Sequence, residues 1–88
     1  MALQLDRPYE IDPQVAVRPE PFGALCYHYG NRRLTFLKSP DIVRVVQCLG
    51  EHDSVAETLA SCRIEPDRWP AFVTALSSLE SSAVIHER

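Results

Sequence analysis

The sequence predicts an α+β domain with a winged-helix-like order, in which a three-stranded antiparallel sheet is followed by three helices. Three observations support this prediction. Extended apolar segments lie before residue 39, segments with helical spacing lie after it, and a chain of 88 residues has room for one hydrophobic core. Strands that are segregated from helices in this way form a sheet that packs on the helical layer.

Residues 1–14 differ from the rest of the chain, because they contain Pro8 and Pro13 and show little periodicity. We therefore expect an extended N-terminal arm that leans on the domain without joining its core. Residues 15–88 then form a single domain. Its first strand is expected at Val15–Val17, since the prolines of the following RPEPF segment cannot donate ladder hydrogen bonds.

The segment from Gly23 to Lys38 predicts a β-hairpin. Gly30 and Asn31 tolerate a positive φ angle, so they are expected to form a two-residue loop between the strands. Side chains alternate across a strand, so the hairpin has an apolar face, expected to line the core, and a wetter face. The apolar face carries the pairs Tyr27 with Leu34 and Leu25 with Phe36, and the wetter face carries Cys26, His28, Arg33 and Thr35.

Two helices are predicted from their caps. Ser39 is a helix N-cap followed by Pro40 at the first helical position, and Ser54 with Glu57 three residues later has the pattern of a capping box. Apolar residues recur at helical spacing after each cap. They are Ile42, Val45, Val46 and Leu49 in the first helix, and Val55, Leu59 and Cys62 in the second.

The third helix is expected to begin near Asp67 or Arg68, because Pro70 is tolerated only in a first turn. Its apolar stripe has helical spacing and consists of Trp69, Phe72, Val73, Leu76 and Leu79. The pattern fades after this stripe. Val84 and Ile85 fit either a last helical turn or a short strand.

The composition disfavours nucleic-acid and membrane proteins. The net charge is −3, whereas nucleic-acid-binding domains usually carry an excess of basic residues. The sequence contains no apolar run near the roughly 20 residues of a membrane helix. Asp6 and Pro8 interrupt the N-terminus before the apolar region of a secretory signal can form, so we expect a cytoplasmic protein.

The sequence shows no catalytic or metal-binding constellation. Cys26 and His28 lie two residues apart on one strand face, but nothing marks the third orienting group that an activated thiolate needs. The cysteines Cys26, Cys48 and Cys62 lack the spacing of a zinc site, and we interpret them as reduced apolar residues. We therefore expect no enzymatic activity, no cofactor and no bound metal.

The third strand, Arg32–Lys38, is expected at a sheet edge with unpaired backbone groups. Two interpretations stay open: its charges protect the edge from aggregation, or the edge accepts an extended peptide as a further strand. Pairing with a second copy keeps a homodimer open as well. The alternative function is a winged-helix DNA-binding regulator, although Arg68 is the single cation of the third helix.

The run VAVRPEPFGALCYHYGNRRLTFLKSPDIV, residues 15–43, resembles the mycofactocin biosynthesis chaperones. These belong to the PqqD-like domains, the recognition elements of ribosomally made, modified peptides (RiPPs). The RPEPFGAL segment, the YGNRRLTFLKSP hairpin exit and the helix order carry the resemblance. It implies a noncatalytic, winged-helix-like chaperone that binds the leader of a short precursor peptide by strand addition. The chaperone would present the peptide to a radical S-adenosylmethionine (SAM) maturase, whose iron–sulfur clusters belong to that partner.

The resemblance also implies where the leader binds, namely between the third strand and the third helix. The implied residues are Arg32, Arg33, Leu34, Thr35, Phe36, Leu37, Arg68, Trp69, Phe72, Val73 and Leu76. An acidic and apolar leader is expected. Its charges would lie near the arginines and its apolar side chains near Phe72 and Leu76.

Overall fold

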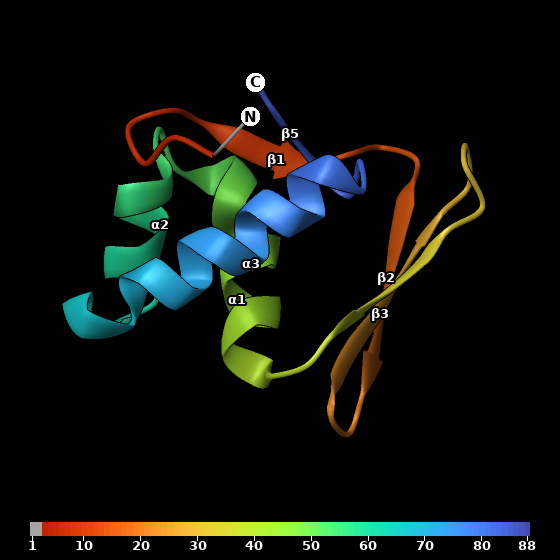
Figure 1. The fold of residues 1–88 in the computed structure, drawn as a ribbon, viewed down its shortest axis with the longest axis horizontal. Coiled ribbons are helices and arrows are strands. Elements are labelled where there is room, and N and C mark those ends of the chain that lie inside the picture. The colour runs from red at the N-terminus through yellow and green to blue at the C-terminus, as the bar shows by residue number, and fades with distance from the viewer. Residues whose placement is uncertain (1–2) are drawn as a thin grey trace.

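The computed structural model describes residues 3–88, in which a three-stranded sheet stands beside a layer of helices (Figure 1). The strands are β1 (Tyr9–Ile11), β2 (Val15–Glu20), β3 (Gly23–His28), β4 (Leu34–Leu37) and β5 (Ile85–Glu87). The helices are α1 (Pro40–Cys48), α2 (Val55–Ser61) and α3 (Trp69–Ser81), with 3₁₀ turns at Leu49–Glu51 and Pro66–Arg68. The antiparallel order β2-β3-β4 followed by α1, α2 and α3 confirms the predicted α+β class.

The helix starts follow the predicted caps. The Ser39 hydroxyl accepts a hydrogen bond from the Ile42 N–H at 3.3 Å, and the Ser54 hydroxyl accepts one from the Glu57 N–H at 3.1 Å. Pro70 lies in the first turn of α3, where its missing N–H needs no partner. These local signals therefore place the three helices correctly.

The prediction that the first strand ends before Pro19 is wrong, since β2 continues through it to Glu20. The Tyr29 N–H donates to the Gln14 carbonyl at 2.8 Å, which fixes the alternation of hydrogen-bonded pairs along β2 and β3. In this alternation Pro19 and Ala24 form a non-hydrogen-bonded pair, so the nitrogen of Pro19 points away from β3. Proline is tolerated there because β2 is an edge strand.

Strands β3 and β4 form the predicted hairpin, and its register is the predicted one, with Tyr27 opposite Leu34 and Leu25 opposite Phe36. The assignment of its faces is wrong. Cys26 and His28 are buried, with 1% and 7% of their surface exposed, whereas Leu34 and Phe36 are 60% and 56% exposed. The small side chains Ala24 and Cys26 let α1 pack closely on β3, so the bulkier face points outward.

The loop of this hairpin also differs from the prediction, because Arg32 and not Gly30 or Asn31 has a positive φ angle (61°). The buried His28 side chain explains the difference. Its Nδ1 accepts hydrogen bonds from the N–H groups of Gly30 and Asn31, at 3.0 and 3.1 Å. The chain therefore reverses over four residues, and the Arg32 N–H donates to the His28 carbonyl.

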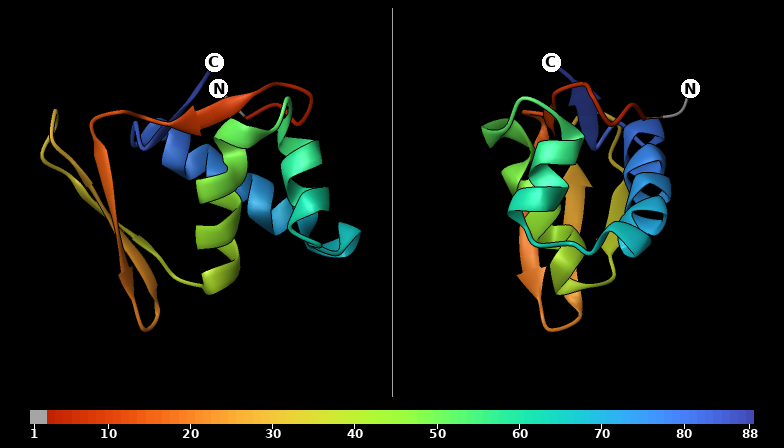
Figure 2. Two further views of the ribbon diagram at one scale, coloured as in Figure 1. Left: turned by 180° about the vertical axis from the view of Figure 1, so that it is seen from behind. Right: turned by 90° about the vertical axis from the view of Figure 1, so that its left-hand side faces the viewer.

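The N-terminal segment belongs to the core, contrary to the expectation for residues 1–14. Tyr9 is 2% exposed and Leu3 is buried in the same cluster. Strand β1 pairs antiparallel with β5, so the open question about Val84 and Ile85 is resolved as a strand at Ile85. Figure 2 shows this second small sheet along one end of the helical layer. The first two residues of the predicted arm lie outside the described part.

A polar cluster ties the β1–β5 sheet to the segment that leads into β2. His86 Nε2 lies 2.8 Å from a Glu10 carboxylate oxygen, and His86 Nδ1 lies 3.2 Å from an Asp12 oxygen. The contact with Glu10 is the main cause that raises the pKa of His86 above its ordinary value of 6.5. The hydrogen bond from the Gln14 N–H is the main cause that lowers the pKa of Asp12. Protonated His86 can thus donate to two carboxylates.

Gly23 is predicted to be far less tolerant of a side chain than Gly50. It has φ +154°, and an added Cβ would lie 2.0 Å from the Leu37 carbonyl oxygen. Gly23→Ala should lower the free energy of unfolding by about 2 kcal/mol or more in urea titrations. Gly50→Ala is the control, because its Cβ would meet nothing closer than 3.8 Å. That variant should be neutral or stabilising by up to about 1 kcal/mol, and equal effects of the two would contradict the prediction.

The polar cluster predicts a pH-dependent contribution to stability. Because folding raises the pKa of His86, its contribution is complete below pH 6.5 and is lost as the pH rises through the folded-state value. Urea unfolding of the native protein and of His86→Gln should therefore differ most at about pH 5.5 and least at about pH 8.5. A difference that stays constant over this range contradicts the prediction. The Asp12 contribution is lost only as the pH falls through a pKa below 3.8, outside the measured window.

Candidate functional site

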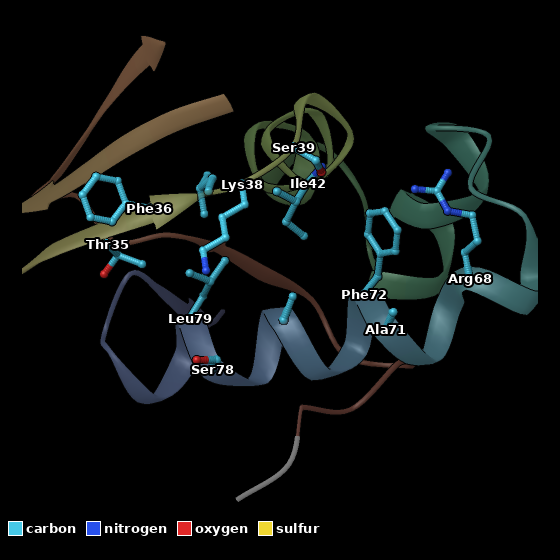
Figure 3. A pocket seen from close by; sticks show the side chains of 12 residues that line it. Thr35, Phe36, Lys38, Ser39, Ile42, Arg68, Ala71, Phe72, Ser78 and Leu79 are labelled. Carbon is cyan, nitrogen blue, oxygen red and sulfur yellow. The ribbon is translucent and has the colours of Figure 1, made fainter. Parts of the chain in front are cut away.

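A groove of about 360 Å³ lies between the end of β4, the start of α1 and the length of α3 (Figure 3). The sheet side is formed by Thr35, Phe36, Leu37, Lys38, Ser39 and Ile42, and the α3 side by Arg68, Ala71, Phe72, Ala75, Ser78 and Leu79. Most of these side chains are apolar or small. The groove can therefore bury apolar side chains of a ligand along α3.

The backbone of β4 has an unused edge along this groove. Within residues 3–88, β4 pairs only with β3. The His28 N–H donates to the Arg33 carbonyl at 3.0 Å, so the alternation of the ladder directs the Thr35 N–H toward β3. The N–H and C=O groups of Leu34 and Phe36 then point away from the sheet. They are available to an added strand.

The width of the groove comes from small residues on α3. Ala71, Ala75 and Ser78 are spaced four and three residues apart, so they lie on one face of the helix. This face is next to the buried stripe of Phe72, Leu76 and Leu79, which packs into the core. Larger side chains on the small-residue face would fill the space beside β4.

Arg68 is the best anchored charge in the groove. One of its terminal nitrogens donates to an Asp41 carboxylate oxygen at 3.0 Å, and its guanidinium carbon lies 5.2 Å from the centre of the Phe72 ring. The hydrogen bond from Arg68 is the main cause that lowers the pKa of Asp41. Lys38 lines the opposite wall, as Figure 3 shows, so both sides of the groove carry a cation.

The structure brings five of the predicted binding residues together in the groove, namely Thr35, Phe36, Leu37, Arg68 and Phe72. Arg32, Arg33, Leu34, Trp69, Val73 and Leu76 are not among its lining residues. Trp69 packs against the core and its Nε1 donates to the Ile64 carbonyl, and Leu76 is fully buried. Arg32 lies in the hairpin loop. Leu34 contributes its outward backbone groups to the edge rather than its side chain to the groove.

The predicted binding residues leave out the small residues of α3, the residues that follow β4, and Leu79. The missed lining residues are Lys38, Ser39, Ile42, Ala71, Ala75, Ser78 and Leu79. The helical spacing of Ala71, Ala75 and Ser78, with Arg68 at its N-terminal end, was the signal that could have found the α3 wall. The helical spacing predicts Ile42 and Leu79 as core residues. They are buried as predicted, and they also line the groove.

Cys26 and His28 do not have the arrangement of a catalytic pair. Both are buried, and His28 Nδ1 is occupied by two backbone N–H groups. Burial raises the pKa of the Cys26 thiol, which disfavours the reactive thiolate. Within residues 3–88, no group of three or more His, Cys, Asp or Glu side chains is placed to hold a metal ion. Among the same residues, no helix has the length and apolar character needed to cross a membrane.

Comparison with known proteins gives one consistent result. The family model of the peptide chaperone MftB family matches residues 8–86. The chain is 40% identical over 84 residues to peptide chaperone MftB of Mycobacterium ulcerans (strain Agy99), covering 96% of this chain and 77% of that protein. It is 41% identical over 83 residues to peptide chaperone MftB of Mycobacterium tuberculosis (strain ATCC 25618 / H37Rv), covering 94% and 76%. No solved structure matches the chain significantly.

Proposed function

The chain belongs to the peptide chaperone MftB family, and from this premise we propose that it binds the leader of the mycofactocin precursor peptide by strand addition. It then presents that peptide to a radical SAM maturase. The observation that supports the binding mode best is the unused edge of β4 beside an apolar groove. The chaperone itself is noncatalytic in this proposal and holds no cofactor.

Strand addition uses the backbone of β4 for affinity and the groove for selection. The outward N–H and C=O groups of Leu34 and Phe36 hydrogen-bond to an extended leader. Alternate leader side chains then enter the groove, where Ile42, Phe72 and Leu79 supply apolar contacts. Lys38 and Arg68 favour a leader that also carries acidic residues.

The other edge of the sheet is a poorer acceptor of a peptide. Strand β2 contains Pro19, which has no N–H to donate to an added strand. The groove described above lies along β4, and none of its lining residues comes from β2. An added strand at β2 would therefore gain fewer hydrogen bonds and no contact with α3. We propose β4 as the leader-binding edge for this reason.

The open shape of the groove suits a carrier. A leader on β4 leaves the rest of the precursor peptide outside the chaperone, where a maturase can act on it. Chemistry at the modified residues then depends on the iron–sulfur clusters of that partner. The leader must become ordered as it binds, which lowers the affinity for a given contact area.

The proposal is tested by titrating the ¹⁵N-labelled protein with a synthetic mycofactocin precursor peptide. We expect a dissociation constant of about 1 μM or somewhat tighter, equivalent to about −8 kcal/mol. Amide shifts should concentrate in Leu34–Ser39 and along α3. Failure of this peptide to bind, together with saturable binding of duplex DNA, would favour the winged-helix regulator instead. A peptide with the same composition in scrambled order is the control.

Substitution of Phe36 separates backbone from side-chain contributions to binding. Phe36→Pro removes an outward N–H, whereas Phe36→Ala removes the aromatic ring and keeps that N–H. We expect Phe36→Pro to bind the precursor peptide about tenfold more weakly than Phe36→Ala, because a ladder hydrogen bond is lost and the proline ring obstructs the added strand. Both variants should unfold cooperatively in urea. Equal affinities of the two folded variants would refute strand addition at β4.

Thr35→Pro is the matched control for folding. Thr35 directs its N–H toward Cys26 of β3, so proline at this position breaks the β3–β4 ladder. We expect this variant to lose stability by about 3 kcal/mol, in contrast to Phe36→Pro. Urea titrations of both variants measure the difference. A stable Thr35→Pro variant would show that the assignment of outward and inward groups is reversed.

A further inference from the structure

A second hollow of about 510 Å³ continues from the α3 end of the groove. It lies where α1, the end of α2 and the turn before α3 meet, and its lining residues are Asp41, Arg44, Cys48, Ser61, Cys62, Arg63, Ile64 and Arg68. Arg68 lines both the groove and the second hollow. In Figure 3 its side chain stands at the end of α3, beyond Phe72 as seen from β4. The two spaces are therefore neighbouring parts of one surface.

The second hollow concentrates positive charge in an acidic protein. Three of its side chains are guanidinium groups and one is a carboxylate, whereas the whole chain has a net charge of −3. Arg44 donates to one Asp41 oxygen at 3.2 Å, and Arg68 donates to the other at 3.0 Å. Asp41 therefore holds both arginines in place but balances only one of them. An anion that enters the hollow meets an excess of preordered donors.

Arg63 adds a second uncompensated positive charge to the hollow. It is exposed, and within residues 3–88 it makes no ion pair, unlike Arg44 and Arg68. Its backbone has φ 60° where the chain leaves α2, which directs the chain from α2 toward the turn before α3. Among residues 3–88, Arg63 thus lines the hollow without an ion-pair partner of its own.

We propose that this hollow, lined by Arg44, Arg63 and Arg68, is an anion subsite that binds one acidic side chain of the leader peptide. The inference rests on the proposed function and adds to it a charged position in the leader. A leader strand that follows β4 past its carboxyl end reaches Ser39 and then Arg68, the residue shared by both spaces. The acidic residue lies beyond the apolar residues that occupy the groove. Its carboxylate accepts from Arg63 and from the remaining N–H groups of Arg68.

Other anions of similar charge are less suited to the hollow. A nucleic-acid backbone needs a row of cations, whereas the hollow holds three arginines around one aspartate in a chain of net charge −3. Three arginines and one aspartate leave an excess of two positive charges, and a single carboxylate on Arg63 and Arg68 lowers that excess to one. A short acidic peptide segment is therefore the ligand that the charge arrangement fits.

The test compares Arg63→Asn with Arg32→Asn in titrations with the synthetic leader peptide. The two arginines form a matched pair, since their φ angles are 60° and 61° and each variant removes one positive charge. Asn is tolerated in this backbone conformation. We expect Arg63→Asn to weaken leader binding about threefold to fivefold and Arg32→Asn to leave it within about 1.5-fold.

The same titrations with altered leaders identify the acidic residue. Each Asp or Glu of the leader is replaced in turn by Asn or Gln. We expect one replacement to weaken binding to the native protein about threefold to fivefold and to have little further effect with Arg63→Asn. The Nε–H resonance of Arg63 should shift on addition of the native leader and not of that altered leader.

The possible outcomes separate this inference from the proposed function. If the leader binds but Arg63→Asn and Arg32→Asn have equal effects, the anion subsite is overturned and the chaperone function stands. Normal binding of a leader with every Asp and Glu neutralised also overturns the subsite alone. If the leader does not bind the native protein at all, the proposed function fails and the subsite fails with it.

Discussion

The packing of β3 on α1 is the contact on which the rest of the site depends. Ala24 and Cys26 present little volume toward the helices, so the sheet approaches α1 closely and is held there. Helix α3 packs instead along the core through Phe72, Leu76 and Leu79, and turns its small-residue face toward β4. The edge of β4 therefore faces a helix that does not cover it. A bulkier inner face on β3 would move the sheet away from α1 and change this spacing.

Local signals account for the parts of the fold that the sequence predicted correctly. Ser39, Ser54 and Pro70 act within one helical turn of their own position, so their meaning does not depend on distant contacts. The hairpin register is also local, because a reversal near Gly30 sets which residues are opposite one another. The edge position of β4 followed from its place as the last strand of the meander. These local features predict β4, the starts of the helices and the order of the elements along the chain.

The errors about the buried hairpin face, the N-terminal segment and the groove concern contacts between residues far apart in the sequence. Which hairpin face is buried depends on how closely α1 approaches, and the more apolar face is the one that stays outside. Strand β1 near the start of the chain pairs with β5 near its end. Neither segment has an alternation of apolar and polar residues long enough to predict a strand. Part of the groove was missed for a related reason: Ala71, Ala75 and Ser78 matter through the space they leave, which only the facing strand defines. A pattern of hydrophobicity records the side chains that fill space and not those that leave it open.

An unpaired edge strand must accept its ligand without pairing with copies of itself. Strand β4 is four residues long and is flanked by Arg33 and Lys38. If two copies paired through β4 in antiparallel fashion, Arg33 of each would approach Lys38 of the other, and like charges opposite one another disfavour such pairing. The same charges attract an acidic peptide strand. Protection of the edge and the proposed selection of a leader are thus compatible consequences of one charge pattern. The proposed anion subsite would extend this pattern past the end of the strand, where charge can select the ligand without weakening the ladder.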